Sequence, residues 1–405
     1  MSAAVAVTGI GLVTPAGIGT KESWERLLSG VPTAATDPEL AGLPVDFSCR
    51  VPQQQLDSSL GRGLRWRTDR FIQFAVVAAR EAVADAGLYP AEWDGTRVGV
   101  VIGVGGSAME HMGEYAKLAE GRHGAVTPSL VARSQPGMAA GEVSLDLGAK
   151  GPTMCTSTVC SSGTAALSAA KMLLDAGSCD IVVAGGTDSA RCHWGSVAFW
   201  RMGALSTRCD TPAEASRPFD ADRDGFVLAE GSGVLVVERA EHARARSARV
   251  YAELAGQGLA GDAHHFVAPH PDGAGAVHAM RAALADAGLS AGDIDHVNAH
   301  GTSTTLNDLA EARALRRVFG APPPVTANKG VFGHAIGGGG AIEAACSVLS
   351  LHHSVIPPTA NLDRLDPDID LDIVAGRPRP AALSAVLSNS VGFGGHNAAV
   401  VFRKP

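Results

Sequence analysis

The sequence of 405 residues predicts an α/β protein in which helices cover both faces of layered sheets. Short, nearly continuous apolar runs alternate with Ala-rich stretches of helical periodicity, which is typical of buried strands separated by helices. The composition is 46% apolar and 18% charged, so the chain can bury a large core. A short segment also recurs in the two parts of the chain, which indicates an internal duplication. These observations favour two similar halves packed into one layered protein.

The apolar runs are predicted to be strands, and the Ala-rich stretches are predicted to be helices. The strands are Val5–Thr8, Val98–Ile102, Ile181–Ala184, Gly233–Val237, Val297–Ala299, Val386–Ser388 and Ala399–Phe402. The helices include Phe71–Ala86, Gly163–Ala176, Gly275–Ala287 and Leu309–Phe319. The first run has neither a basic segment before it nor a cleavage site, so we interpret it as a buried strand and turn and not as a signal peptide.

The duplication is visible in two helix ends. Ala84–Leu88 and Ala285–Leu289 both read Ala-Asp-Ala-Gly-Leu, and each is followed by a polar stretch and an apolar strand. We therefore predict an N-terminal half, residues 1–245, and a C-terminal half, residues 246–405. Helix termini from the two halves are expected to converge on one site.

The bulk composition argues against several classes of protein. The net charge of −8 and the low aromatic content do not favour a nucleic-acid partner. No apolar run approaches the roughly 20 residues that span a bilayer, so no membrane partner is expected. Seven cysteines without CxxC spacing argue against a disulfide framework or a zinc site, and they fit a reducing cytoplasm.

Cys160 is the candidate nucleophile. It lies between Thr156–Val159, which is rich in cap residues, and an Ala-rich helix that Gly177 ends, so we place it at or just before a helix N-terminus. A helix N-terminus stabilises a thiolate and lowers its pKa, and the free N–H groups there can bind an oxyanion. Free cysteines are more often small buried hydrophobes, which is our interpretation of the other six.

His300 follows a predicted strand, in the segment Val297–Thr304, with Asp308 and Glu311 downstream. The end of a strand is where α/β folds present ligand-binding groups. A single histidine of this kind is more often a satisfied core or surface residue. The same chain also contains a candidate nucleophile at the start of a helix, and this combination favours a functional role for His300.

His334 and Lys329 lie in the segment Asn328–Gly337, which is followed by further glycines up to Gly340. Consecutive glycines allow a close approach of backbone or ligand before the next helix, expected to begin near Ala341. Phe393 lies among glycines in Ser388–Asn397, so its ring could move as a gate or form a packed turn.

These motifs, taken together and in this order, resemble the elongating β-ketoacyl-acyl-carrier-protein synthases, the thiolase-fold condensing enzymes of fatty acid and type II polyketide synthesis. The motifs are Thr158-Val159-Cys160-Ser161-Ser162-Gly163, Ala299-His300-Gly301-Thr302-Ser303-Thr304, Lys329 with Gly333-His334, and Gly392-Phe393-Gly394-Gly395-His396-Asn397. The resemblance covers nearly the whole chain. It implies a thiolase-like, internally duplicated five-layer αβαβα fold, with cap and dimer-interface insertions in the N-terminal half. It also implies a homodimer or a heterodimer with a related subunit.

The resemblance also assigns roles. Cys160 would hold an acyl group as a thioester, and the N–H groups of Cys160 and Phe393 would bind the oxyanion. After a malonyl group loses CO₂, His300 and His334 would stabilise the enolate as neutral imidazoles. Lys329 would hold His334, and Glu311 would tie Lys329 into this network.

The implied partner is an acyl carrier protein that delivers acyl and malonyl thioesters on a phosphopantetheine arm. Thr302 and Thr304 resemble the hydroxyls that hold this arm, and Asp308 is a supporting residue. The implied reaction needs no metal and no redox cofactor. An arginine cluster, Arg62, Arg65, Arg67 and Arg70, either meets the carrier or forms a solvated face.

Four positions depart from the pattern of the fatty acid enzymes. Thr305 stands where Pro is common, Val391 replaces a frequent Phe, and Val267 lacks a hydroxyl used by some relatives. Asn307 beside Asp308 is more like polyketide sequences. These departures leave the acyl-chain preference and the pathway open.

Four rival activities are less consistent with the motifs. A degradative thiolase would carry a second cysteine where Phe393 and His396 stand, and a priming condensing enzyme would have Asn in place of His334. A chain-length-factor subunit would lack the nucleophile. A dinucleotide-binding oxidoreductase is suggested only by Gly9-Ile10-Gly11, and a lone GxG is a weak signal.

Overall fold

The computed structural model describes residues 4–106 and 111–405, and most of its strands join one large mixed sheet. The sheet consists of two sets of strands, one from each half, with β2 (Gly17–Ile18) paired to β1. The first set is β1 (Val5–Thr14), β5 (Val98–Gly103), β6 (Thr153–Thr156), β7 (Ile181–Ser189) and β8 (Glu230–Arg239). The second set is β9 (Ala252–Gly261), β10 (His296–Asn298), β11 (Val325–Thr326), β14 (Ala385–Gly392) and β15 (His396–Arg403).

The two sets have the same strand order and the same directions. The order is β6-β5-β7-β8-β1 in the first set and β11-β10-β14-β15-β9 in the second. In each set the first two pairings are parallel and the last two are antiparallel. The sets join where β1 pairs with β9, with Val7 opposite Ala252. The repeated topology confirms the predicted duplication.

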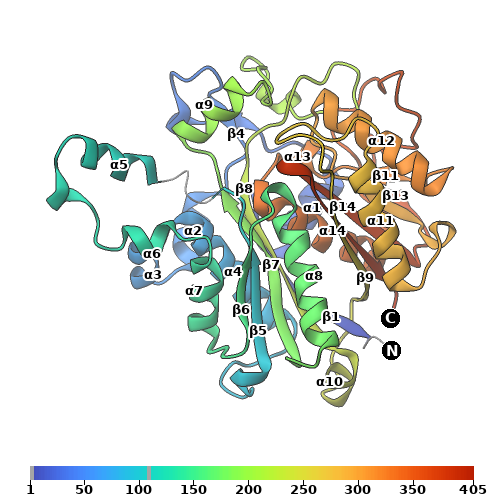
Figure 1. Cartoon of the computed structure of the whole chain (residues 1–405), viewed down its shortest axis with the longest axis horizontal. Helices are drawn as coiled ribbons and strands as arrows, with labels where there is room; N and C mark the ends of the chain where they lie inside the picture. Colours follow the sequence, from blue (N-terminus) through green and yellow to red (C-terminus); the bar gives the residue numbers. More distant parts are fainter. Residues whose placement is uncertain (1–3, 107–110) are drawn as a thin grey trace.

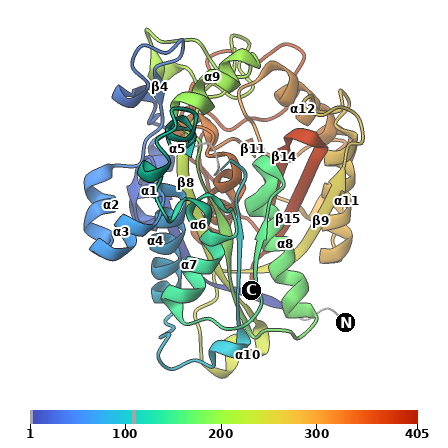
Figure 2. The same cartoon turned by 60° about the vertical axis from the view of Figure 1, so that its left-hand side comes forward.

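Helices form three layers around the two sets of strands (Figures 1 and 2). In the first half α4 and α7 cover the outer face, and in the second half α11 and α12 do so. Helices α8 and α14 contact each other and strands of both sets, so they form the middle layer. The bounds are α4 (Arg70–Asp85), α7 (Met138–Leu147), α8 (Ser162–Asp175), α11 (Ala274–Ala287), α12 (Thr305–Phe319) and α14 (Gly339–His353). This is the predicted five-layer fold.

The repeated helix ends make equivalent contacts in the two halves. Asp85, at the end of α4, accepts a hydrogen bond from the N–H of Ile10 in β1 at 3.0 Å. Asp286, near the end of α11, accepts one from the N–H of Gln257 in β9 at 3.0 Å. The aspartate of the shared Ala-Asp-Ala-Gly-Leu sequence therefore ties each outer helix to a strand.

Two pairs of glycines let these outer helices lie close to the sheet. A Cβ atom on Gly11 would lie 1.9 Å from the carbonyl oxygen of Ala78 in α4, and one on Gly258 would lie 2.1 Å from that of Ala279 in α11. Gly9 and Gly256 are equally crowded. The Gly-x-Gly pattern at the N-terminus thus serves helix packing, so the dinucleotide-binding interpretation is wrong.

We expect Gly11→Ala to lower the free energy of unfolding by about 3 kcal/mol, since an added methyl group must push α4 away from β1. Urea unfolding followed by circular dichroism measures this. Gly63→Ala is the matched control, because nothing lies within 4 Å of a Cβ atom there. Equal urea midpoints for the two variants would contradict the close contact.

All of the predicted strands and helices are present, but three main strands, β6, β9 and the two-residue β11, were missed. The division after residue 245 falls between α10 and β9, and it stays a prediction, as do the insertions. The remaining helices are α1 (Thr20–Ser29), α2 (Gln53–Ser59), α3 (Arg62–Arg67), α5 (Met112–Ala119), α6 (Leu130–Ser134), α9 (His193–Arg201), α10 (Ala240–Ala245) and α13 (Lys329–Phe332). The short strands are β3 (Ala35–Thr36), β4 (Phe47–Ser48), β12 (Val355–Ile356) and β13 (Arg379–Pro380).

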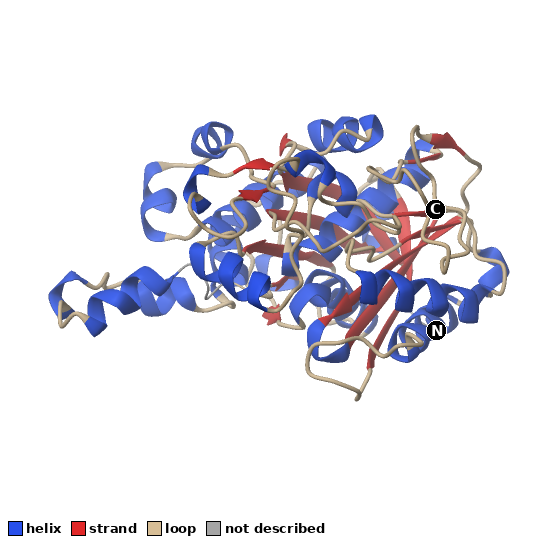
Figure 3. Ribbon diagram, turned by 90° about the horizontal axis from the view of Figure 1, so that it is seen from above, coloured by secondary structure: helices blue, strands red, loops and turns tan. Residues whose placement is uncertain are grey.

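The segment with α5 and α6 extends from one side of the layered body (Figures 1 and 3). Asp69, just before α4, holds it there through the guanidinium of Arg133, with Nε 2.8 Å away, and through His111, whose Nε2 lies 2.8 Å away. In the described part of the chain, none of the seven cysteines is in a disulfide bond, and no helix is long and apolar enough to cross a membrane.

Candidate active site

A cavity of about 250 Å³ is lined by residues from both halves of the chain. It brings together six of the predicted site residues: Cys160, His300, Thr302, Thr304, His334 and Phe393. Lys329, Glu311 and Asp308 do not line it and are buried. The structure thus separates the predicted residues into a group that a substrate can touch and a group that supports it.

Cys160 lies in a single 3-10 turn, η5 (Val159–Ser161), that leads directly into α8. Its predicted place at a helix N-terminus is confirmed. Val159 has a φ of 53°, a strained value for a β-branched residue, and the turn is held by a 2.9 Å hydrogen bond from the N–H of Thr158 to Ser162 Oγ. The strained turn fixes the direction in which the thiol points.

The pKa of Cys160 differs from our expectation. Burial raises it to about 12, while the charge of Lys329 and the N–H of Phe393 act in the opposite direction. The thiol is 4% exposed, so desolvation of a thiolate outweighs these contributions. Burial therefore acts against the lowering of this pKa that the helix N-terminus is predicted to cause.

The turn that carries Phe393 approaches Cys160 closely. A Cβ atom on Gly392 would lie 2.6 Å from the carbonyl oxygen of Thr158 and 3.3 Å from the backbone nitrogen of Cys160. The N–H of Phe393 donates to the Cys160 sulfur. The half-buried ring of Phe393 packs against Phe199, with centroids 6.3 Å apart. Both predicted oxyanion donors therefore lie beside the thiol, and movement of the ring stays a prediction.

His300 is held in one tautomer. Lys329 Nζ lies 3.2 Å from its Nδ1 and 2.6 Å from its carbonyl oxygen. An ammonium group has no acceptor, so Nδ1 must accept and the ring proton must be on Nε2. Burial, followed by the charge of Lys329, holds the pKa of His300 well below its usual value. His300 is thus a neutral donor through Nε2.

The contacts of Lys329 and Glu311 differ from those implied by the resemblance. Lys329 binds His300 and not His334, and its second partner is Glu343, which the sequence reasoning missed. Glu311 accepts from the N–H groups of His300 at 2.7 Å and Gly301 at 2.8 Å, and it makes no hydrogen bond with Lys329. Both predicted supports therefore act on His300.

His334 meets His300 edge to face, with ring centroids 5.4 Å apart, and also contacts the ring of Phe226 at 5.2 Å. Its backbone is fixed by hydrogen bonds to Val227 and Ala229. Burial, followed by the charge of Lys329, holds its pKa well below the usual value. Both histidines are therefore neutral at physiological pH.

Asp188, at the end of β7, is a second residue that sequence reasoning missed. Its buried carboxylate accepts hydrogen bonds from the N–H groups of Gly105, Gly106 and Gly337 at 2.8–3.0 Å. It joins a loop of the first half to the turn before α14 in the second. Asp188 could have been found as an acidic residue at the end of an apolar strand. Glu343 could have been found as the one acidic residue in an apolar helix.

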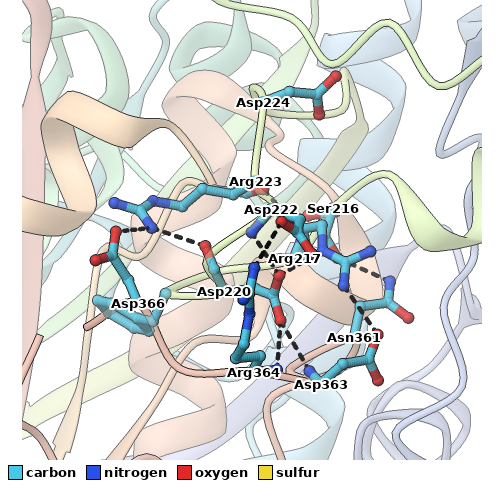
Figure 4. Close-up of polar contacts among 12 residues, drawn as sticks. Ser216, Arg217, Asp220, Asp222, Arg223, Asp224, Asn361, Asp363, Arg364 and Asp366 are labelled. Atoms are coloured by element: carbon cyan, nitrogen blue, oxygen red, sulfur yellow. Dashed lines mark hydrogen bonds and ion pairs between the residues drawn. The ribbon is translucent and has the colours of Figure 1, made fainter. Parts of the chain in front are cut away.

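Thr302 and Thr304 lie together at the cavity wall, with their hydroxyl oxygens 2.9 Å apart. Asp308 sits behind them and accepts a hydrogen bond from the N–H of Phe219 at 2.9 Å. Burial raises the pKa of Asp308 to about 6, and this N–H and the guanidinium of Arg223 oppose the rise. Figure 4 shows the ion pairs that surround Arg223.

A group of buried oxygens behind the site has no hydrogen-bond donor in the described chain. The atoms are Asn298 Oδ1, Glu343 Oε2, Ser388 Oγ and Asn389 Oδ1. Oxygen acceptors are the ligands of ordered water and of hard cations. No group of three or more His, Cys, Asp or Glu side chains among the described residues is arranged for a metal ion, and the prediction of a metal-free site stays a prediction.

The chain is similar to proteins of known class along its whole length. Residues 2–243 match the model of the β-ketoacyl synthase N-terminal domain, and residues 251–363 match that of the C-terminal domain. The chain is 41% identical to 3-oxoacyl-[acyl-carrier-protein] synthase 2 of Staphylococcus aureus (strain COL), over 99% of this chain and 98% of the relative.

Two solved structures are also similar over 100% of both chains. One is the ishigamide ketosynthase/chain length factor, with a TM-score of 0.93 and 33% identity. The other is a type II polyketide ketosynthase in complex with its acyl carrier protein, with a TM-score of 0.90 and 30% identity. The chain therefore belongs to the β-ketoacyl synthase family, and it is an acyltransferase of the 3-oxoacyl-[acyl-carrier-protein] synthase type.

Proposed function

We propose that this protein condenses a Cys160-bound acyl group with a malonyl group carried by an acyl carrier protein, in fatty acid or polyketide synthesis. The observation that carries the proposal is that Cys160, His300 and His334 line one cavity, with His300 fixed as an Nε2–H donor by Lys329. The likeness to a ketosynthase in complex with its carrier supports the choice of partner.

The first half-reaction is acyl transfer. The Cys160 thiol attacks the thioester of the acyl group, and the N–H groups of Cys160 and Phe393 stabilise the oxyanion that forms. When the intermediate collapses, the arm leaves as a thiol that carries the proton lost by Cys160.

The second half-reaction is decarboxylative condensation. Loss of CO₂ from the malonyl group leaves an enolate, whose oxygen accepts hydrogen bonds from His300 and His334. The carbanion then attacks the acyl group on Cys160, and the β-ketoacyl product remains on the arm. Neutral donors suit this step in a dry cavity, where hydrogen bonds to a developing charge are worth more than in water.

The arm and the carrier are expected to approach along Thr302 and Thr304. Three of the four arginines proposed for carrier docking already contact acids: Arg65 contacts Asp57, Arg67 contacts Glu142, and Arg70 contacts Glu230. Docking of the carrier on this cluster stays a proposal. Arg62 is exposed, and it has no carboxylate partner in the described chain. The cytoplasm stays the expected location.

Strand β6 is an exposed edge of the sheet, and it suits pairing with a second subunit. We propose a dimer, formed with another copy or with a related subunit. Similarity to the ishigamide ketosynthase/chain length factor favours keeping the heterodimer as the alternative.

Acyl transfer to Cys160 can be tested directly. After incubation with acyl-carriers of several chain lengths, intact-protein mass spectrometry should show one added acyl group, and peptide mapping should place it on Cys160. Added malonyl-carrier should then remove the adduct with release of CO₂. Absence of any adduct with every chain length would contradict the proposed function.

A further inference from the structure

Arg223 is buried at the centre of a charged cluster that joins three segments of the chain. Its side chain is 1% exposed, and it lies in the loop 216–226 (Figure 4). The other two segments are the start of α12 and residues 361–366. A fully buried guanidinium is costly to desolvate, so its ion pairs and hydrogen bonds must compensate for that cost.

On one side Arg223 holds the first turn of α12. Its Nε donates to the carbonyl oxygen of Thr304 at 3.4 Å, and its Nη2 donates to that of Thr305 at 3.3 Å. The same Nε lies 3.5 Å from Asp308 Oδ2, which is fully buried. Three contacts of one guanidinium therefore fix the first turn of α12.

On the other side Arg223 holds the loops that face it. Its Nη1 donates to Asp366 Oδ2 at 2.6 Å and to the carbonyl oxygen of Asp220 at 2.7 Å. Asp220 in turn accepts from Arg217 Nε at 3.0 Å and from the N–H groups of Asp363 and Arg364 at 2.9 Å. Figure 4 shows these contacts as one continuous network.

Both ends of this network reach the cavity. Thr304 and Thr305 line it from α12, while Asp224 and Phe226 line it from the loop 216–226. The two walls also touch directly, because the N–H of Gly225 donates to the carbonyl oxygen of Ser303 at 3.1 Å. Since Phe226 packs on His334, the cluster connects the wall that faces the arm with a residue of the reaction centre.

We propose that Arg223 is a positioning residue for the pantetheine arm: it holds the Thr302–Thr304 hydroxyls at the cavity wall in register with Phe226 and His334. This rests on the proposed function, in which these threonines bind the arm. Only the planar fork of arginine reaches two acids and three carbonyl groups at once, and lysine offers a single point charge.

The test compares two thioesters that carry the same acyl group. One is the acyl-pantetheine, which has the arm, and the other is acyl-N-acetylcysteamine, which lacks most of it. Acylation of Cys160 is followed by mass spectrometry at several substrate concentrations, with Arg223→Lys and Arg223→Met as variants. Arg364→Ala is the matched control, since that side chain is 72% exposed in the same network.

For Arg223→Met we expect KM for acyl-pantetheine to rise about tenfold and kcat to change less than about twofold, because charge-assisted contacts are lost. With acyl-N-acetylcysteamine, KM and kcat of the Arg223 variants should stay within about twofold of the values of the unaltered protein. Arg364→Ala should keep KM and kcat within about twofold for both thioesters. Arg223→Lys should lose less than Arg223→Met, because it keeps the charge beside Asp308.

Correct folding is checked by the rate at which iodoacetamide alkylates Cys160, which should be unchanged. If Arg223→Met is unfolded, Arg223→Lys and Asp366→Asn, which removes one ion pair, give the same comparison. Equal losses with both thioesters, or an unchanged KM for acyl-pantetheine, would overturn the positioning role. If the unaltered protein accepts neither thioester but does accept acyl-carriers, the arm contacts are wrong; if it accepts none, the proposed function itself is wrong.

Discussion

Cys160→Gln should lower condensation by at least about 10³-fold, because no other nucleophile replaces the thiol. The variant should also lack the acyl adduct. Decarboxylation of malonyl-carrier should continue, and its rate should be equal to or above that of the unaltered protein. The reason is that His300 and His334 line the cavity independently of Cys160 and keep their neutral, hydrogen-bonding forms.

Two measurements separate these effects: intact-protein mass spectrometry for the adduct, and release of labelled CO₂ from malonyl-carrier. Cys155→Ser is the matched control, since Cys155 does not line the cavity and its thiol donates only to the carbonyl oxygen of Thr156. It should keep both activities. Condensation by Cys160→Gln at the original rate would show that the nucleophile lies elsewhere.

His300→Ala should lower malonyl decarboxylation by at least about 100-fold, the usual loss for one donor to an oxyanion. Acylation of Cys160 should change only a few fold, because the proposed donors for that step are N–H groups of Cys160 and Phe393. Cys160→Gln should lose acylation and keep decarboxylation, whereas His300→Ala should keep acylation and lose decarboxylation. His278→Ala, a change at an exposed histidine of α11, is the control and should leave both steps intact.

The pH dependence offers a further check on the same residue. A histidine whose pKa lies well below its usual value is neutral at every pH above that lowered pKa. Decarboxylation in single turnover should therefore be independent of histidine titration between about pH 6 and 8. Burial raises the pKa of Glu343, the partner of Lys329, to about 7, so the same profile is measured with Glu343→Gln. A rise in rate between about pH 6 and 7 that persists in this variant would mean that His300 or His334 is charged in the resting site.

The fold could be predicted largely because its central strands are continuous apolar runs. Strand β9 was missed, since its sequence Ala-Glu-Leu-Ala-Gly-Gln-Gly-Leu-Ala-Gly has few β-formers and its glycines serve contact with α11. Strand β6 was missed for a different reason. It is an exposed edge, so its Thr-Met-Cys-Thr sequence shows no apolar run.

The six residues that line the cavity were found because each lies in a motif at the end of an element. Their supports could not be found in the same way. Glu343 and Asp188 act through tertiary contacts with segments far away in the sequence, and neither has a motif of its own. The raised pKa of Cys160 was missed because helix position is local, whereas burial depends on the whole fold.

The strained turn of Cys160 belongs to the first half of the chain, whereas His300, His334 and Phe393 belong to the second. During synthesis the thiol therefore leaves the ribosome long before the groups that make it useful. The proposed oxyanion donors come together only when β14 and the turn after it pack beside the turn of Cys160. The cavity is therefore incomplete until the second half of the chain has folded onto the first.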